Sequence, residues 1–219
     1  MAWALLGSSQ VHADLVEVNL ISNDVVEVRG AIFEWVDSTT VTNGRLLPFL
    51  QVSGIGVAGD YNRKKSIVVR DVPVVTLNGT NYLQFALDIQ GTAVSLDTIE
   101  IFTGGVAGSD INDLGALGVK RWDLDKSCWN YEAEEGSGCE PVWEDVIVQC
   151  DPHRNIRQSG IDIFLYVPAS NFEGALLSDR VYFFCVFGNP LKPFPSSITM
   201  HPKGRGTMKW GIRKPRPVR

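Results

Sequence analysis

The stretch 72–89, VPVVTLNGTNYLQFALDI, indicates the fold more clearly than any other part of the sequence. Residues 72–77 are rich in β-branched side chains, and apolar and polar residues alternate through much of 82–89, as is typical of β-strands. The Asn78-Gly79 pair between the two runs is a strong signal for a type I′ turn, because both residues tolerate a positive φ angle. The stretch therefore predicts a β-hairpin.

Runs of the same kind lie on both sides of this hairpin. They are short, alternating or rich in β-branched residues, and Gly, Pro, Asn and Asp separate them. The segments 54–65, 104–118 and 126–141 are rich in glycine or polar residues and are expected to be loops, and a helical turn is expected within 169–177. Further strands are expected at 15–20, 25–36, 46–52 (an edge strand or extended loop, because of Pro48), 66–70, 94–102, 119–124, 142–149, 161–167, 181–187 and 207–212.

The pattern predicts about ten to twelve strands and contains no amphipathic helix of useful length. Parallel crossovers usually need helices, so the sheets are expected to be antiparallel. Hydrophobic residues make up 44% of the 219 residues, which suffices for a core. We predict an all-β, single-domain protein whose residues 14–190 form an antiparallel β-sandwich of jelly-roll-like type.

The two ends of the chain differ from this domain. Residues 1–13 resemble a truncated signal peptide, with an apolar run before the possible cleavage site Val11-His12-Ala13. Residues 191–219 form a basic, Pro-rich tail, expected to be a solubilising end that contributes a last strand at 207–212 and does not bind nucleic acid. The tail has eight basic residues and no acidic one, so the remaining residues, with twelve basic and twenty-five acidic side chains, carry a formal charge of −13. No apolar run is long enough to span a membrane.

The four cysteines, Cys128, Cys139, Cys150 and Cys185, are even in number, as in disulfide-bonded exported proteins. Three pairings are possible. Cys128 and Cys139 flank a polar loop and are able to close it, whereas Cys150 and Cys185 lie at or within expected strands. Zinc binding is disfavoured, since there is no C-x-x-C spacing.

The sequence contains an ordered series of strand-like segments: GAIF (30–33), LPF (47–49), DVPVV (71–75) with Asn78-Gly79, FALDI (85–89), SLDTIEIF (95–102), WDLD (122–125), SGIDIFLYVP (159–168), VYFF (181–184) with Phe187-Gly188, and GTMKWG (206–211). In this order the segments resemble a known family, the secreted β-rich bacterial surface proteins of the PEP-CTERM (exosortase-associated) type. The sorting tail itself, with its Pro-Glu-Pro motif, is absent from this sequence. The resemblance implies an exported sandwich with a cell-surface, adhesion or biofilm-matrix role, whose partners are extracellular polysaccharide, other surface proteins or further copies of the chain.

Calcium is the ion that the sequence suits best, because exported β-sandwiches often bind it through loop carboxylates. Asp123 and Asp125 alternate and are expected on one face of a sheet, and Asp110 and Asp113 lie in a glycine-rich loop. These four residues are candidate calcium ligands, although a solvent-facing stripe explains them equally well. No other cofactor is expected.

Carbohydrate binding is the alternative function. Lectin-like modules stack exposed aromatic rings on sugar faces. Trp129, Tyr131 and Trp143 lie in or next to the acidic loop 126–141 and are the candidate ligand-binding residues, whereas Trp122 lies in the expected strand 119–124 and is more typical of a core.

Catalysis is not expected. The sequence has no Gly-x-Ser-x-Gly motif, and no histidine has a recognisable nucleophile and orienting partner. A pair of carboxylates on a β scaffold would suffice for a glycan-active enzyme, which is a second alternative. The preferred hypothesis is a non-catalytic, secreted surface or matrix component.

Overall fold

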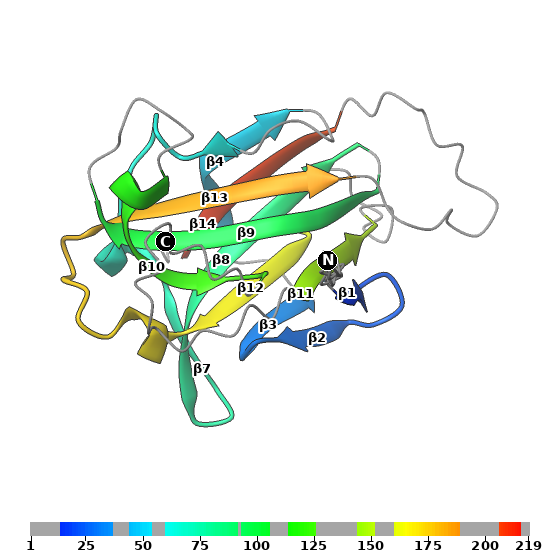
Figure 1. Ribbon diagram of the computed structural model, residues 1–219, viewed down its shortest axis with the longest axis horizontal. Helices are drawn as coiled ribbons and strands as arrows, with labels where there is room; N and C mark the ends of the chain where they lie inside the picture. The colour runs from blue at the N-terminus through cyan, green and yellow to red at the C-terminus, as the bar shows by residue number, and fades with distance from the viewer. Residues whose placement is uncertain are drawn as a thin grey trace, which may run out of the picture.

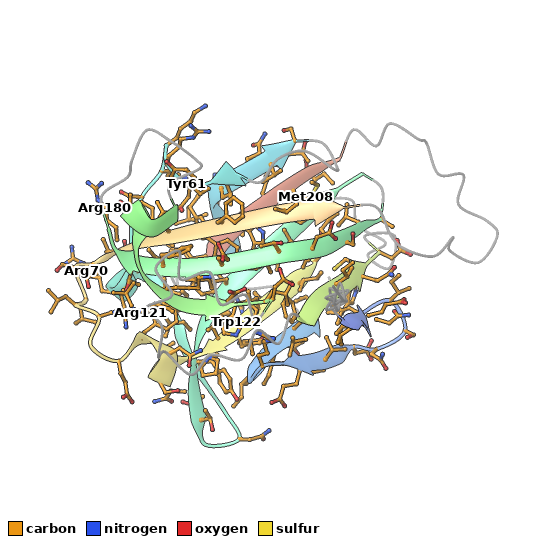
Figure 2. All side chains as sticks on the ribbon, in the orientation of Figure 1. Tyr61, Arg70, Arg121, Trp122, Arg180 and Met208 are labelled. Carbon is orange, nitrogen blue, oxygen red and sulfur yellow. The ribbon has the colours of Figure 1, made fainter. Side chains whose placement is uncertain are left out.

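The structure, a computed structural model, describes residues 14–36, 44–53, 60–91, 93–105, 114–125, 144–151, 160–188 and 206–215. These residues form two seven-stranded sheets that pack face to face (Figure 1). The predicted all-β sandwich is confirmed.

Sheet A is formed by β1 (Asp14–Asn19), β5 (Asp60–Tyr61), β6 (Ile67–Val68), β9 (Val94–Gly104), β10 (Gly118–Asp123), β11 (Glu144–Cys150) and β13 (Arg180–Gly188). The strand order is β1-β11-β9-β13-β5, with β10 paired to β9 and β6 paired to β13. The two long strands β9 and β13 pair antiparallel at the centre of this sheet. They lie in front in Figure 1.

Sheet B is formed by β2 (Val25–Val28), β3 (Ala31–Trp35), β4 (Gly44–Ser53), β7 (Val74–Leu77), β8 (Thr80–Gln90), β12 (Ile163–Pro168) and β14 (Thr207–Pro215). The strand order is β2-β3-β12-β8-β14-β4, with β7 paired to β8. Among the described residues, 3-10 turns connect strands at η1 (Val69–Asp71), η2 (Leu114–Leu117) and η4 (Ala169–Phe172).

The core lies between the sheets and is dominated by aromatic rings that meet across them. Phe183 of sheet A packs against Trp210 of sheet B at 4.6 Å between ring centroids, and against Phe85 at 5.4 Å. Towards the edge that carries β2, Trp122 of sheet A packs against Phe33 of sheet B at 6.3 Å. Burial of such rings is the main force that holds two sheets together.

The Asn78-Gly79 hairpin is present as predicted. Its two residues have φ angles of 49° and 82°, the positive values that a type I′ turn requires. Leu77 pairs with Thr80 directly at the turn. The hairpin projects beyond the rest of the sandwich in Figure 1.

The structure departs from the sequence expectations in the direction of one strand pair. Strands β1 and β11 pair in parallel, from Asp14 opposite Glu144 to Asn19 opposite Gln149. The prediction of purely antiparallel sheets assumed that parallel neighbours follow one another through a helix. Here the chain between β1 and β11 passes through both sheets, so no helical crossover is needed.

The carboxyl-terminal strand also differs from its expected place at the end of a tail. Strand β14 is longer than the predicted 207–212 and lies inside sheet B, between β8 and β4. Trp210 on this strand is completely buried. Strand β4, which contains Pro48, is an edge strand, the first of the two alternatives expected for residues 46–52. The helical turn expected within 169–177 is limited to η4, and the short strand β5 lies in the expected loop 54–65.

Candidate functional site

The two calcium candidates that the structure describes bind backbone and side-chain donors of the protein itself. Asp123 Oδ2 accepts a hydrogen bond from Lys120 Nζ at 2.9 Å, and its Oδ1 accepts one from the Asp125 N–H at 2.9 Å. Asp125 Oδ1 accepts the N–H of Val146 at 3.0 Å. Strand β10 ends at Asp123, so Asp125 lies beyond it and the expected alternation on one strand does not extend to both residues.

The other calcium candidates, Asp110 and Asp113, lie outside the described residues. Within the described ranges, no three His, Cys, Asp or Glu side chains gather as metal ligands would. Calcium binding stays a prediction.

The carbohydrate candidates Trp129, Tyr131 and Trp143 also lie outside the described residues. The hydrogen bond from Val146 to Asp125 joins the two ends of the chain that flank this segment. Trp122 is 6% exposed and belongs to the core, as its place in an expected strand suggested.

The two described cysteines are not paired with each other. Cys150 on β11 lies opposite Val94, and Cys185 on β13 lies opposite Ile99 on the other side of β9. Val94 and Ile99 are about 16 Å apart along the strand, at about 3.3 Å per residue. A disulfide needs Cα atoms within about 7 Å of each other.

Both side chains are instead thiols in the hydrophobic core, with no exposed surface. Burial, reinforced by the nearby charges of Asp162 and Asp151, raises the pKa of the Cys150 thiol. The expectation that these two cysteines form disulfides is therefore wrong for this part of the chain, because each completes the inner face of sheet A. Cys128 and Cys139 lie outside the described residues.

A cluster of charges that the sequence analysis missed lies on the outer face of sheet A. Lys120 Nζ on β10 contacts Glu100 Oε1 on β9 at 2.6 Å and Asp123 Oδ2 at 2.9 Å. Asp123 lies directly opposite Glu100 in the β9–β10 register. The Glu100 side chain is only 7% exposed, and its Oε2 atom has no hydrogen-bond partner in the described part of the protein.

The surroundings of this charge cluster change its proton affinities. Burial raises the pKa of Glu100, while Lys120 acts in the opposite direction. For Lys120, burial acts to lower the pKa, but the bonds to Glu100 and Asp123 act to raise it and are stronger. The net effect is a raised pKa of Lys120. The Lys120 ammonium also lies 5.9 Å from the centre of the Phe102 ring. A glutamate within the apolar run Ile99-Glu100-Ile101-Phe102 is the sequence signal that points to this cluster.

Aromatic side chains extend the same outer face beyond the charges. Tyr61, Phe102, Leu117 and Tyr182 form a buried cluster there. The Tyr182 hydroxyl donates to the Gly105 carbonyl at 3.1 Å. This face is thus partly a second apolar layer, which leaves these rings without the open surface that sugar stacking needs.

The outer face of sheet B carries a second polar network. The Tyr166 hydroxyl on β12 donates to Glu34 on β3 and accepts a long hydrogen bond, 3.4 Å, from Gln84 on β8. Burial, together with the bond to Glu34, raises the pKa of Tyr166. Arg213 lies over the Phe164 ring at 5.9 Å. The network joins three neighbouring strands.

A third contact on the same face joins β8 to β14. Lys209 Nζ lies 3.8 Å from Asp88 Oδ2, which also accepts a hydrogen bond from Gln90 at 3.0 Å. Burial raises the pKa of Asp88, and Lys209 opposes that shift. In all three cases, a charged or hydroxyl group connects adjacent strands.

Among the described residues, no helix has both the length and the apolar character needed to cross a membrane. The chain matches no known protein-family model, no curated protein and no solved structure.

Proposed function

We propose that this protein is an exported, non-catalytic component of the cell surface or extracellular matrix. The observation that carries the proposal is the role of its ionisable groups. Lys120 bridges β9 and β10, Tyr166 bridges β3, β8 and β12, and Lys209 approaches Asp88 across β8 and β14. Ionisable groups that connect neighbouring strands in this way stabilise the sheets. A rigid sandwich of this kind suits a protein that bears mechanical load or presents its loops to a partner.

The resemblance of the ordered segments to PEP-CTERM-type surface proteins supports the same proposal. The test is the location of the native protein. An antibody against the purified chain is used on cytoplasmic, envelope and medium fractions of the producing cells. Recovery in the envelope or medium is expected, and recovery in the cytoplasm alone would refute the proposal.

A lectin-like, carbohydrate-binding module is the second candidate. It is favoured by the bond between Asp125 and Val146, because this bond fixes the base of the segment that bears Trp129, Tyr131 and Trp143. Binding to a glycan array is expected to be lost in Trp129→Ala and retained in Val25→Ala, which alters an exposed side chain on β2. Equal binding by both variants would exclude this segment as the sugar site.

A further inference from the structure

The two lateral edges of the sandwich carry charges of opposite sign. Along its main strand order sheet A ends in β1 and β5, with β10 and β6 as further outermost strands on these two sides, and sheet B ends in β2 and β4. Strands β1 and β2 follow each other in the chain and form one edge, and β4 and β5 are in contact at the other. Each edge therefore includes strands from both sheets, and we name the edges after β1/β2 and β4/β5.

The β1/β2 edge is acidic. The described side chains from 16 to 28 include Glu17, Asp24 and Glu27 and no basic residue, and Arg29 follows at the end of β2. Asp24 and Glu27 are exposed. Val16 and Val25 on the same two strands are 41% and 54% exposed, so the edge also offers apolar surface.

The β4/β5 edge is basic. Arg45 on β4 lies opposite Lys214 on β14, and Arg63, Lys64 and Lys65 follow β5. All five side chains are exposed, and Lys65 Nζ bonds the carbonyl of Pro48, which holds the loop after β5 against β4. No carboxylate side chain is described in 45–53 or 61–68.

From these edges we infer that copies of the chain associate head to tail, with the acidic β1/β2 edge of one copy against the basic β4/β5 edge of the next. Pairing of two identical edges brings like charges together and is opposed. Pairing of unlike edges is attractive, and because the two surfaces differ, the contact is heterologous. A heterologous contact that does not close into a ring grows into a filament. Pro48 interrupts the donors of β4, so side-chain charges carry the contact more than a continuous backbone ladder does.

The inference deepens the proposed function, because a matrix component needs to assemble into filaments. It rests on the proposed function only for this biological setting. The charge-driven contact predicts a steep dependence on salt. The Debye length falls from about 30 Å at about 0.01 M ionic strength to about 3 Å at about 1 M. Association is therefore expected at low salt and monomers at high salt.

The test is sedimentation velocity of the full chain at increasing concentration and at both ionic strengths. Wild-type protein is expected to form species that grow with concentration at low salt. Arg45→Gln/Lys64→Gln on the basic edge and Asp24→Asn/Glu27→Gln on the acidic edge are each expected to be monomeric. An equimolar mixture of the two variants is expected to give dimers that do not grow, because each dimer retains only one intact pair of edges.

Arg70→Gln/Arg180→Gln is the matched control, since it also removes two exposed basic charges, but from η1 and β13 beside β6, and it leaves β1, β2, β4, β5 and the loop after β5 unchanged; it is expected to assemble like wild type. Thermal melting checks that every variant is folded. A wild-type chain that is monomeric at low salt overturns the inference. So does a result in which the substitutions on only one edge prevent assembly, because this would indicate a symmetric contact between two copies of that edge. Neither result bears on the cellular location, which tests the proposed function separately.

Discussion

Replacement of Lys120 by methionine tests what the charge cluster on the outer face of sheet A contributes to folding. The substitution keeps the long apolar part of the side chain and removes the ammonium that lies 2.6 Å from Glu100 and 2.9 Å from Asp123. The two carboxylates, 7% and 13% exposed, then face each other across β9 and β10 without the Lys120 ammonium that bridges them in wild type. Loss of one partner from a buried ion pair costs about 3–5 kcal/mol. Because Lys120 itself is 29% exposed, we expect a loss of about 2–4 kcal/mol in the free energy of unfolding at neutral pH.

The pH dependence of this loss follows from the sign of the pKa shifts. Burial already raises the pKa of Glu100, and removal of Lys120 raises it further, so the folded variant binds a proton more tightly than the unfolded chain does. The variant therefore loses stability as the pH rises from 4.5, the pKa of Glu100 in the unfolded chain, through the higher pKa of Glu100 in the folded protein. The stability returns on acidification. The difference between Lys120→Met and wild type is expected to shrink between about pH 7 and about pH 4. In wild type, Lys120 contributes stability because its pKa is higher in the folded protein than in the unfolded chain. This stability is fully present below pH 10.5, the pKa of Lys120 in the unfolded chain, and is lost as the pH rises through the higher pKa of the folded protein.

The assay is urea unfolding followed by tryptophan fluorescence, since Trp122 and Trp210 lie in the core. Lys64→Met removes an exposed lysine and is the matched control, with an expected change within about 0.5 kcal/mol. The double variant Lys120→Met/Glu100→Gln is expected to recover part of the loss, because one uncompensated charge is gone. A loss below about 0.5 kcal/mol in Lys120→Met at neutral pH, or one that does not change with pH, would refute the reasoning.

Three further predictions concern the core, a close backbone contact and calcium. Cys150 and Cys185 are expected to resist alkylation in the native protein and to react fully in urea without a reductant, as measured by peptide mapping; recovery of either residue in a disulfide would contradict this. Gly105→Ala is expected to lower the free energy of unfolding by about 1–3 kcal/mol, because the added Cβ overlaps the Leu117 carbonyl, whereas Ser66→Ala at an exposed position changes it little. If calcium binds, the melting midpoint rises with added calcium and falls with EDTA, and an unchanged midpoint under both conditions ends the calcium hypothesis.

Short-range patterns in the sequence predicted most of the strands. The Asn78-Gly79 turn, the β-branched run before it and the alternation after it depend only on residues close together in the chain. Strands β9, β12 and β13 carry the same local signals. The prediction of β5 failed because it has two residues, too few to show any period. The expected pairing of Cys150 and Cys185 failed for a different reason, since an even number of cysteines does not reveal that β9 lies between the two strands that carry them.

The candidate sites depended more on tertiary structure than the strands did. Lys120 and Glu100 lie 20 residues apart, and only the β9–β10 pairing brings them together. Glu34 and Tyr166 lie 132 residues apart and meet through the β3–β12 pairing. A pattern within one strand marks Glu100 as an unusual charge in an apolar run, but it does not reveal which residue of another strand contacts it.

By itself, the sequence determined that this chain folds into strands and has enough apolar surface to join two sheets, because side-chain periodicity and turn preferences act over a few residues. Only the tertiary structure decided which strands are neighbours, that β14 lies inside a sheet, and that the two lateral edges differ in charge. The physical reason is that strand pairing is made by backbone hydrogen bonds that nearly every residue can form. The choice of partner therefore depends on how the whole set of side chains packs between the sheets.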